Sequence, residues 1–424
     1  MSASIKKNIY LFLMGKLTAV LGSSIYGFAI GLYILAETGS SLNFAITLMM
    51  SILPRILLAP IAGTLSDRWE RKKIIIISDF ACAIWLLIIF IVFTYFFQEI
   101  WVLYIATAVL SSLNTFYSTA VTSAIYNMVG PDFIQKAMSL NQAAVSTSTI
   151  LGPVLGGVLF GFFQISSFMM INIVAFIISG ICSIFITYNL FAEKRETQVG
   201  NSVFTELKVG LRYVNNQRFL KSLILLSVVL NFWFAVFPVA MPYLVLTVRK
   251  MESYQLGIIE GAFSVGMLIM SIILAQRQEI KRKEWSIICG LFGMAIVLIL
   301  IGIPSFPGFE NLSNSLLFPY LIGMVLLLAS FIMIINMPIM VLLQKSTPDE
   351  YRGRVMALLE TGASAMTPLG FILFGLVLEK APVWVLLGIC GLSILFLTLY
   401  TIKEKTFISS LRESDKVKEV AIEI

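Results

Sequence analysis

Residues 63–73 read GTLSDRWERKK, a short polar stretch between two long apolar runs. The apolar runs cover residues 44–65 and 74–97, and each is long enough for a helix to cross the roughly 30 Å hydrocarbon core of a bilayer. The connection between them is charged and very short. This pattern predicts two membrane-spanning helices joined by a tight turn at the membrane surface.

The same alternation continues through all 424 residues of the chain. Hydrophobic residues make up 58% and charged residues only 12%, and the mean hydropathy is +0.94. A soluble protein of this length would need far more charge to cover its surface. We therefore expect an all-α integral membrane protein with spans at residues 9–35, 44–65, 74–97, 101–127, 137–163, 166–190, 219–248, 254–276, 285–303, 315–343, 355–378 and 383–402.

The distribution of basic residues predicts the orientation of these spans. With the N-terminus in the cytoplasm, 24 of the 30 Lys and Arg fall in cytoplasmic segments, and only Arg249, Lys250 and Lys380 fall in outer loops. Short cytoplasmic loops carry an excess of Lys and Arg. We therefore expect both termini in the cytoplasm. The same asymmetry accounts for the net charge of +7 without a nucleic-acid partner.

The longest loop, residues 191–218, divides the chain into two halves of six spans. The expected halves are residues 1–190 and 219–402, followed by a cytoplasmic tail at residues 403–424. Within the loop, residues 202–214 could form a short helix on the membrane surface.

The two halves carry similar local sequences at a separation of about 217 residues. Pro131-Asp132 precedes the fifth span, and Pro348-Asp349 precedes the eleventh. Within these spans, Gly152-Pro153 corresponds to Thr367-Pro368. We therefore expect two pseudo-symmetric halves with the substrate site between them near the midplane. Chance similarity of apolar sequence is the alternative.

The stretch at residues 63–73 resembles the conserved loop of the major facilitator superfamily, G-x-x-x-D-R-x-G-R-[RK]. The matching residues are Gly63, Asp67, Arg68, Arg71 and Lys72, and Glu70 replaces the usual second glycine. The resemblance implies a major facilitator fold in which this loop latches the cytoplasmic side.

The residue types of this loop suit a latch. Gly63 would let two helix ends approach closely, and Asp67 would lie against the positive end of a neighbouring helix. Arg68 and Arg71 would pair with carboxylates of the other half. A basic loop that only sets topology is the alternative. The corresponding stretch of the second half, residues 276–283, is degenerate, and no latch is expected there.

A second motif, GPVLGG at residues 152–157, resembles the antiporter motif of the same superfamily. Its matching residues are Gly152, Pro153, Gly156 and Gly157. Proline would kink the helix and the glycines would let a partner helix pack closely, which seals a transport path against leak. Ordinary small-residue packing is the alternative. Together the two motifs favour export.

Further details resemble the macrolide-efflux and siderophore-exporter branch of the superfamily. They are the stretch from Leu53-Pro54-Arg55 to Gly63, the Ser-Asp-Arg-Trp loop, and Pro348 through Val355. One departure is that the fourth span has no arginine, which many proton-driven exporters of the superfamily carry there.

Charged residues inside spans are costly and are functional candidates. The proton-coupling candidates are Arg55, Asp79, Glu260 and Glu360. We hypothesise that Glu260 or Glu360 exchanges protons while Arg55 tunes a nearby carboxylate, since burial favours a protonated carboxyl and a cation favours the carboxylate. Fixed ion pairs between helices are the alternative. Lys16 is a fifth charged residue within a span; its side chain is long enough to snorkel to the membrane surface, which is favoured over a functional role.

Polar and aromatic residues occur in the first, fourth, seventh and tenth spans, which line the cavity in this superfamily. The candidates for substrate contact are Tyr26, Asn114, Tyr117, Asn231, Trp233 and Asn336. An apolar cavity with a few polar groups suits an amphiphilic compound. Ordinary hydrogen bonding between helices is the alternative for each.

These features predict a secondary exporter of lipophilic or amphiphilic molecules, of drug, macrolide or siderophore type, that works as a monomer by proton-coupled alternating access in a bacterial-type cell membrane. We expect no enzyme activity and no cofactor. The sequence contains no histidine, no G-x-x-x-x-G-K-[ST] loop for ATP and no C-x-x-C pair among its four cysteines, so no metal is expected either. The alternatives are a metabolite uptake symporter, a lipid flippase on the same fold and a membrane-embedded enzyme.

Overall fold

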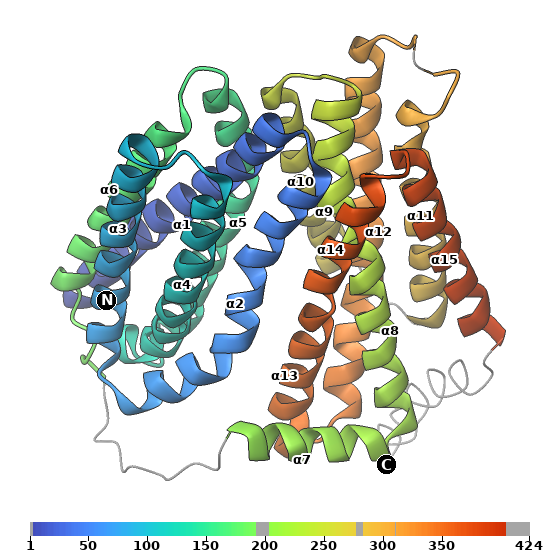
Figure 1. Cartoon of the computed structure of the whole chain (residues 1–424). Coiled ribbons are helices and arrows are strands. Elements are labelled where there is room, and N and C mark those ends of the chain that lie inside the picture. Colours follow the sequence, from blue (N-terminus) through green and yellow to red (C-terminus); the bar gives the residue numbers. More distant parts are fainter. Residues whose placement is uncertain (1–2, 192–202, 277–282, 310, 404–424) are drawn as a thin grey trace, which may run out of the picture. The chain divides into compact units, whose positions relative to one another are not determined.

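The computed structural model describes residues 3–191, 203–276, 283–309 and 311–403 (Figure 1). Within these ranges every regular element is a helix. The predictions for the tail at residues 404–424, for part of the inter-half loop at residues 192–202 and for most of the stretch at residues 276–283 lie outside the described residues.

The first half of the chain forms six long helices, α1 (Ala3–Thr38), α2 (Ser41–Arg68), α3 (Arg71–Tyr95), α4 (Ile100–Val129), α5 (Ile134–Phe160) and α6 (Ile165–Phe185). A shorter helix, α7 (Val203–Asn216), lies where the surface helix was expected. The second half forms α8 (Arg218–Phe234), α9 (Val236–Pro242), the π-helix η1 (Tyr243–Val248), α10 (Ser253–Gln276), α11 (Lys283–Gly302), the 3₁₀ helix η2 (Ile303–Ser305), α12 (Asn314–Ser346), α13 (Asp349–Ala365), α14 (Thr367–Leu378) and α15 (Val383–Lys403).

The described residues contain twelve helical segments long and apolar enough to cross a membrane, as the sequence predicted. Three of these spans are composite. The seventh joins α8, α9 and η1, the ninth joins α11 and η2, and the eleventh joins α13 and α14. The fold class expected from the sequence, an all-α protein with twelve candidate spans, is confirmed.

The polar stretch at residues 63–73 is helical over most of its length. Residues 63–68 form the last turns of α2, which began at a cap where Ser40 accepts a hydrogen bond from the backbone N–H of Asn43 at 3.2 Å. Only Trp69 and Glu70 separate α2 from α3. The expected loop is therefore a two-residue turn between two helix ends.

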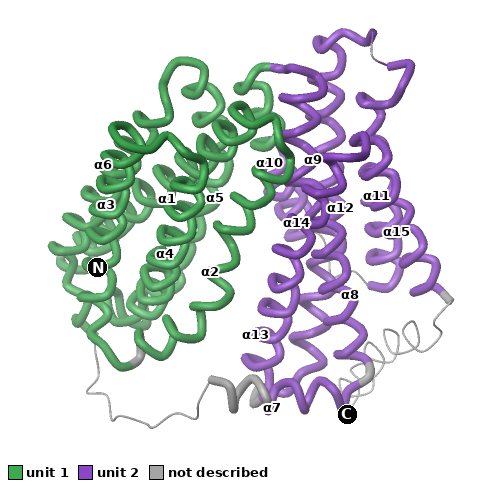
Figure 2. Tube along the Cα trace, in the orientation of Figure 1, with its two compact units in different colours: residues 1–200, 252–261 green, residues 201–251, 262–424 purple. Residues whose placement is uncertain are grey.

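The chain forms two compact units (Figure 2). The first contains residues 1–200 and 252–261, and the second contains residues 201–251 and 262–424. The sequence had assigned all of α10 to the second half, but its first turns cluster with the first unit. This happens because glycines in that part of α10 lie directly against α5.

The two units repeat one pattern of helix pairing. In the first unit α3 packs against α4 and α6, and α1 packs against α5 and α6. In the second unit α11 packs against α12 and α15, and α9 packs against α14 and α15. Since both sets follow the same chain order, the two six-span halves are pseudo-symmetric.

Glycines permit one of these contacts in both units, although Gly152 and Gly370 differ by three positions when Pro153 and Pro368 are aligned. A Cβ added to Gly152 on α5 would collide with the side chain of Ser24 on α1. A Cβ added to Gly370 on α14 would lie 2.6 Å from the Cβ of Ala235, between α8 and α9. Helix backbones approach this closely only where a side chain is absent, so the repeat extends to individual packing contacts.

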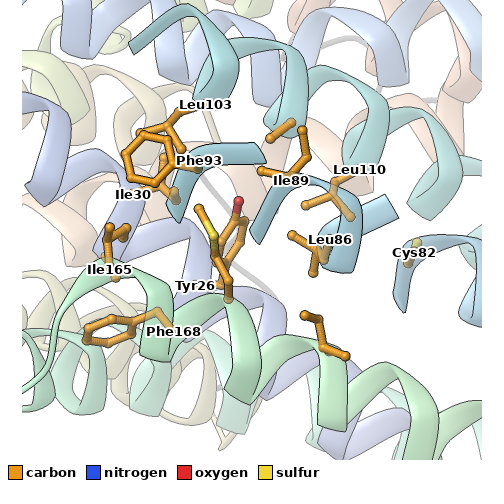
Figure 3. Close-up of a cluster of buried hydrophobic side chains, with 14 of the residues drawn as sticks. Tyr26, Ile30, Cys82, Leu86, Ile89, Phe93, Leu103, Leu110, Ile165 and Phe168 are labelled. Carbon is orange, nitrogen blue, oxygen red and sulfur yellow. The ribbon is translucent and has the colours of Figure 1, made fainter. Parts of the chain in front are cut away.

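One of two apolar clusters in the interior of the first unit comes from four helices (Figure 3). Tyr26 and Ile30 come from α1, Leu86 from α3, Leu103 from α4 and Phe168 from α6. Since lipid is as apolar as these side chains, close packing rather than the hydrophobic effect holds such helices together. The four helices therefore pack closely around any polar group that lies between them.

Candidate functional site

The basic residues at the start of α3 bind backbone carbonyls of the same half. Arg71 Nη1 donates to the carbonyl oxygen of Ser123 on α4 at 2.5 Å. Lys72 Nζ donates to the carbonyl oxygens of Ile184 and Ile186 at 2.8 and 3.0 Å, at the C-terminal end of α6. A cation there satisfies carbonyls that the helix leaves unpaired and complements the helix dipole. Arg71 thus binds a carbonyl within its own half, and its pairing with a carboxylate of the other half stays a prediction.

The structure describes fewer contacts within the first half for the other motif residues of this turn. Arg68 is exposed, and a Cβ added to Gly63 would meet no described atom within 4 Å. The side chain of Asp67 lies outside the described residues. The proposed latch contacts of Gly63, Asp67 and Arg68 therefore stay predictions.

The glycine motif of α5 packs against two helices at once. A Cβ on Gly156 would lie 2.9 Å from the Phe28 ring on α1. A Cβ on Gly157 would lie 2.5 Å from the carbonyl oxygen of Ser253, at the start of α10. On α10, a Cβ on Gly257 would in turn collide with the carbonyl oxygen of Pro153. The glycines thus bring three backbones into close contact, as the sequence predicted for this motif.

The two prolines that the sequence paired behave differently. Pro153 lies inside α5, which continues to Phe160 without a break. Pro368 lies in the first turn of α14, just after α13 ends and Met366 separates the two helices. Proline cannot donate the backbone hydrogen bond of a helix interior, yet only the span that contains Pro368 is divided into two helices.

Two intramembrane charges of opposite sign lie inside the first unit. Asp79 on α3 is 1% exposed and Lys16 on α1 is 7% exposed. Ser179 on α6 donates a hydrogen bond to Asp79 Oδ2 at 2.9 Å. The ammonium of Lys16 lies over the ring of Tyr117 on α4, 4.9 Å from its centroid. The interpretation that Lys16 snorkels is therefore wrong, because aromatic and charged neighbours hold its head group inside the protein.

The side chains of the other charged candidates are less buried than those of Asp79 and Lys16. Arg55 on α2 and Glu360 on α13 are exposed, and Glu260 on α10 is half-buried. The structure gives none of the three a described ion pair. Among the carboxylates predicted to couple protons, Asp79 is the one that its own half encloses most completely.

The predicted substrate-contact residues divide into two groups. Tyr26 and Tyr117 are buried in the interior of the first unit, Tyr26 among apolar side chains (Figure 3). Asn336 is exposed, and Asn114, Asn231 and Trp233 are half-buried. Asn231 Nδ2 donates to the Ser227 carbonyl of its own helix at 2.9 Å. We retain only the second group as candidates for substrate contact, because the interior tyrosines are occupied by packing.

Sequence reasoning missed two aromatic clusters in the second unit. Phe232, Trp233 and Phe374 meet with ring centroids 5.4–6.1 Å apart. Phe234, Phe237 and Phe263 stack with centroids 5.4–5.8 Å apart. The run of aromatics at residues 232–237 was the available signal. Such clusters offer the large apolar surfaces that amphiphilic ligands contact.

Twelve spans in two pseudo-symmetric halves, with a glycine-packed α5 and charges inside the spans, define a membrane transporter. The sequence profile of the Major Facilitator Superfamily matches residues 12–324 and 236–423. The chain therefore belongs to the Major Facilitator Superfamily.

Relatives and solved structures agree with this assignment. The uncharacterized MFS-type transporter YfiS of Bacillus subtilis (strain 168) is 24% identical, over 88% of this chain and 87% of that protein. Macrolide efflux protein A of Streptococcus pyogenes is 23% identical over 90% and 93%, and the multidrug efflux pump Tap of Mycolicibacterium fortuitum is 24% identical over 96% and 97%. The crystal structure of a bacterial homologue of iron transporter ferroportin, in an inward-facing state, shares the fold with a TM-score of 0.69 at 16% identity, over 95% of this chain and 99% of that one.

Proposed function

We propose that the chain exports lipophilic or amphiphilic small molecules, that the proton gradient drives export, and that the mechanism is alternating access. The observation that carries the proposal is the glycine contact of α5 with α1 and the start of α10. Backbones in direct contact leave no space for water between these helices. An antiporter needs such a seal, since any leak of protons would dissipate the gradient that drives it.

The class of substrate is supported by relatives that carry the words macrolide efflux and multidrug efflux in their names. The aromatic clusters at residues 232–237 add apolar surface, and Asn231 and Asn336 add polar groups. This combination suits a bulky molecule with scattered polar groups. We propose a monomer in a bacterial cell membrane with both termini in the cytoplasm.

Inside-out vesicles test the direction and the driving force. An acid lumen should drive accumulation of radiolabelled erythromycin or of ethidium, and collapse of the pH gradient with an ionophore should abolish it. Gly157→Leu should lose this accumulation, whereas Gly161→Leu is the matched control because an added Cβ at Gly161 meets its nearest atom at 3.7 Å. Extrusion of probe from the lumen would instead indicate an uptake symporter, and movement of fluorescent lipid would indicate a flippase.

The coupling proton requires an intramembrane carboxylate, for which the candidates are Asp79, Glu260 and Glu360, with Arg55 as a tuning cation. Substrate-driven proton flux in vesicles separates them. If Glu260 or Glu360 carries the proton, Glu260→Gln or Glu360→Gln abolishes the flux. Undiminished flux in both variants would remove them and leave Asp79.

A further inference from the structure

Asp79 and Lys16 lie far from the ends of their helices. Asp79 is eight residues beyond the start of α3, and Lys16 is thirteen beyond the start of α1. At 1.5 Å per residue these positions are about 12 Å and 20 Å along their helices. Isolated charges at such depth are expensive unless partners surround them.

The carboxylate of Asp79 is only partly satisfied. Oδ2 accepts the hydrogen bond of Ser179, and Ser183 on α6 lies close to the same carboxyl. Oδ1 is buried and has no hydrogen-bond partner among the described residues. An unpaired carboxylate oxygen inside a protein costs free energy that a bound proton would remove, because the protonated oxygen carries no charge.

Lys16 interacts with Asp79 electrostatically without direct contact. No direct ion pair between the two side chains is described, in contrast to Lys73 and Glu70, whose charged atoms lie 3.0 Å apart. The ammonium of Lys16 instead lies over the face of Tyr117, a placement that stabilises a cation through the negative face of the aromatic ring. Lys16 therefore has two places where its charge is stabilised, the Tyr117 ring and the Asp79 carboxylate.

No other charged group faces Asp79 from the described helices packed around it. The titratable groups near it are Lys16 on α1, Cys82 on α3, Tyr117 on α4, Cys182 on α6, and Tyr188 beyond the end of α6. Tyr188 lies outside the membrane span, and burial raises its pKa well above the usual value. Its hydroxyl therefore stays protonated at physiological pH, which leaves Lys16 as the counter-charge of Asp79.

We propose that Asp79 is the proton-binding residue of the transport cycle, with Lys16, Ser179 and Tyr117 as positioning residues. When Asp79 binds a proton at Oδ1, the carboxyl is neutral and the Lys16 ammonium rests on the Tyr117 ring, as in this structure. When the proton leaves, the ammonium moves to the carboxylate and the site falls from one positive charge to none. This inference deepens the proposed function and rests on it.

Helix α1 links this site to the glycine contact that carries the proposed function. Lys16 lies about two turns from Ser24 and three turns from Phe28, which touch Gly152 and Gly156 on α5. Transfer of the ammonium from Tyr117 on α4 to Asp79 on α3 would pull α1 from one neighbour to the other. Through Ser24 and Phe28, the same movement would shift the packing of α1 against α5.

Two measurements on proteoliposomes test the proposal, with radiolabelled erythromycin as the probe. The first is accumulation driven by an acid lumen, and the second is exchange of probe without a pH gradient, a partial reaction that does not involve the proton. Asp79→Asn should reduce the pH-driven accumulation at least tenfold while exchange continues. Asp132→Asn, on the exposed turn before α5, is the matched control and should retain both.

The double variant Lys16→Met/Asp79→Leu separates a proton site from a structural ion pair. Apolar residues can replace a buried ion pair without loss of stability, so this variant restores a protein in which the pair is only structural. If the double variant retains exchange but shows no pH-driven accumulation, the proposal is supported. This conclusion holds even if Asp79→Asn does not reach the membrane. Restored pH-driven accumulation in the double variant overturns it, as does full accumulation by Asp79→Asn. If the wild-type protein moves the probe in neither assay, the proposed function itself fails.

Discussion

The layer formed by α3 and α6 in the first unit and the layer formed by α11 and α15 in the second are built alike. In the first, a Cβ added to Gly180 on α6 would lie 3.0 Å from the ring of Phe80 on α3. In the second, a Cβ added to Gly391 on α15 would lie 2.8 Å from the carbonyl oxygen of Ala295 on α11. A glycine brings the two helices together in both halves.

The side chains that fill the two layers differ. The first holds Asp79 and Ser179, with Lys16 beside them, whereas the second holds fully buried apolar residues such as Leu298 and Ile394. The buried charged side chains described in the second unit, Lys283 and Glu284, lie at the first turn of α11. Among the described residues, the second layer is filled without charges in the middle of its helices. Charges at such depth are costly, so those of the first half point to a chemical function.

The largest expected effect comes from breaking the charge pair. At a pH at which Asp79 has lost its proton, Lys16→Met leaves the buried carboxylate without its counter-charge, which should lower the free energy of unfolding by about 3–5 kcal/mol. The double variant Lys16→Met/Asp79→Leu makes this layer resemble the second half and should recover most of the loss. Thermal unfolding of the detergent-purified proteins measures both. Equal melting temperatures for the single variant and the wild type would show that the interaction of Lys16 with Asp79 does not contribute to stability.

The glycine contact shared by both halves should give the next largest effect. Gly152→Ala and Gly370→Ala each place a methyl group against another helix, which should cost about 1–3 kcal/mol. Gly27→Ala and Gly388→Ala are matched controls, since an added Cβ meets nothing within 4 Å there. These controls should be neutral or up to about 1 kcal/mol more stable. A large loss in one half only would mean that the repeat is not energetically symmetric.

Substitutions of two adjacent lysines in the first turn of α3 should have different effects on stability. Lys72→Gln removes a cation from two carbonyls at the end of α6 and should cost about 1–2 kcal/mol. Lys73→Gln breaks an exposed pair with Glu70, whose side chains are 73% and 44% exposed, and should cost at most a few tenths. Thermal unfolding of the two variants side by side is the measurement. If both cost the same, the contacts of Lys72 with α6 do not stabilise the fold.

The smallest effect is expected at Tyr26. Its hydroxyl is buried without a hydrogen-bond partner among the described residues, so Tyr26→Phe should leave stability unchanged or raise it by about 1 kcal/mol. Probe transport should also be unchanged, because the ring lies in the apolar cluster of Figure 3. A reduced affinity for erythromycin in a transport assay would make Tyr26 a candidate for substrate contact again.

Much of the fold could be predicted from local sequence. Apolar runs gave the twelve spans because each helix must satisfy its own backbone in lipid. The motif at residues 152–157 gave the close approach of α5 to other helices, because only glycine permits it. The breaks within composite spans were not predicted. Both Pro153 and Pro368 lack the backbone N–H of a helix interior, but only the span that contains Pro368 is interrupted.

The surroundings of the candidate site residues could not be predicted from local sequence. Lys16 was assigned to the membrane surface because its length permits snorkelling, and Tyr26 and Tyr117 were assigned to substrate because their spans line a cavity in the superfamily. Helix periodicity alone does not say which neighbour a face meets. The partners of Asp79 are far apart in sequence, as Ser179 follows it by a hundred residues.

By itself, the sequence determined the number of spans, the paired halves and the superfamily, because hydropathy, glycine spacing and the turn at residues 63–73 are local properties. The tertiary structure alone decided that Lys16, Asp79, Ser179 and Tyr117 lie together, and that Arg71 and Lys72 bind carbonyls of their own half. These facts depend on how α1, α3, α4 and α6 pack. A long flexible cation finds its partner only once the helices around it are in place.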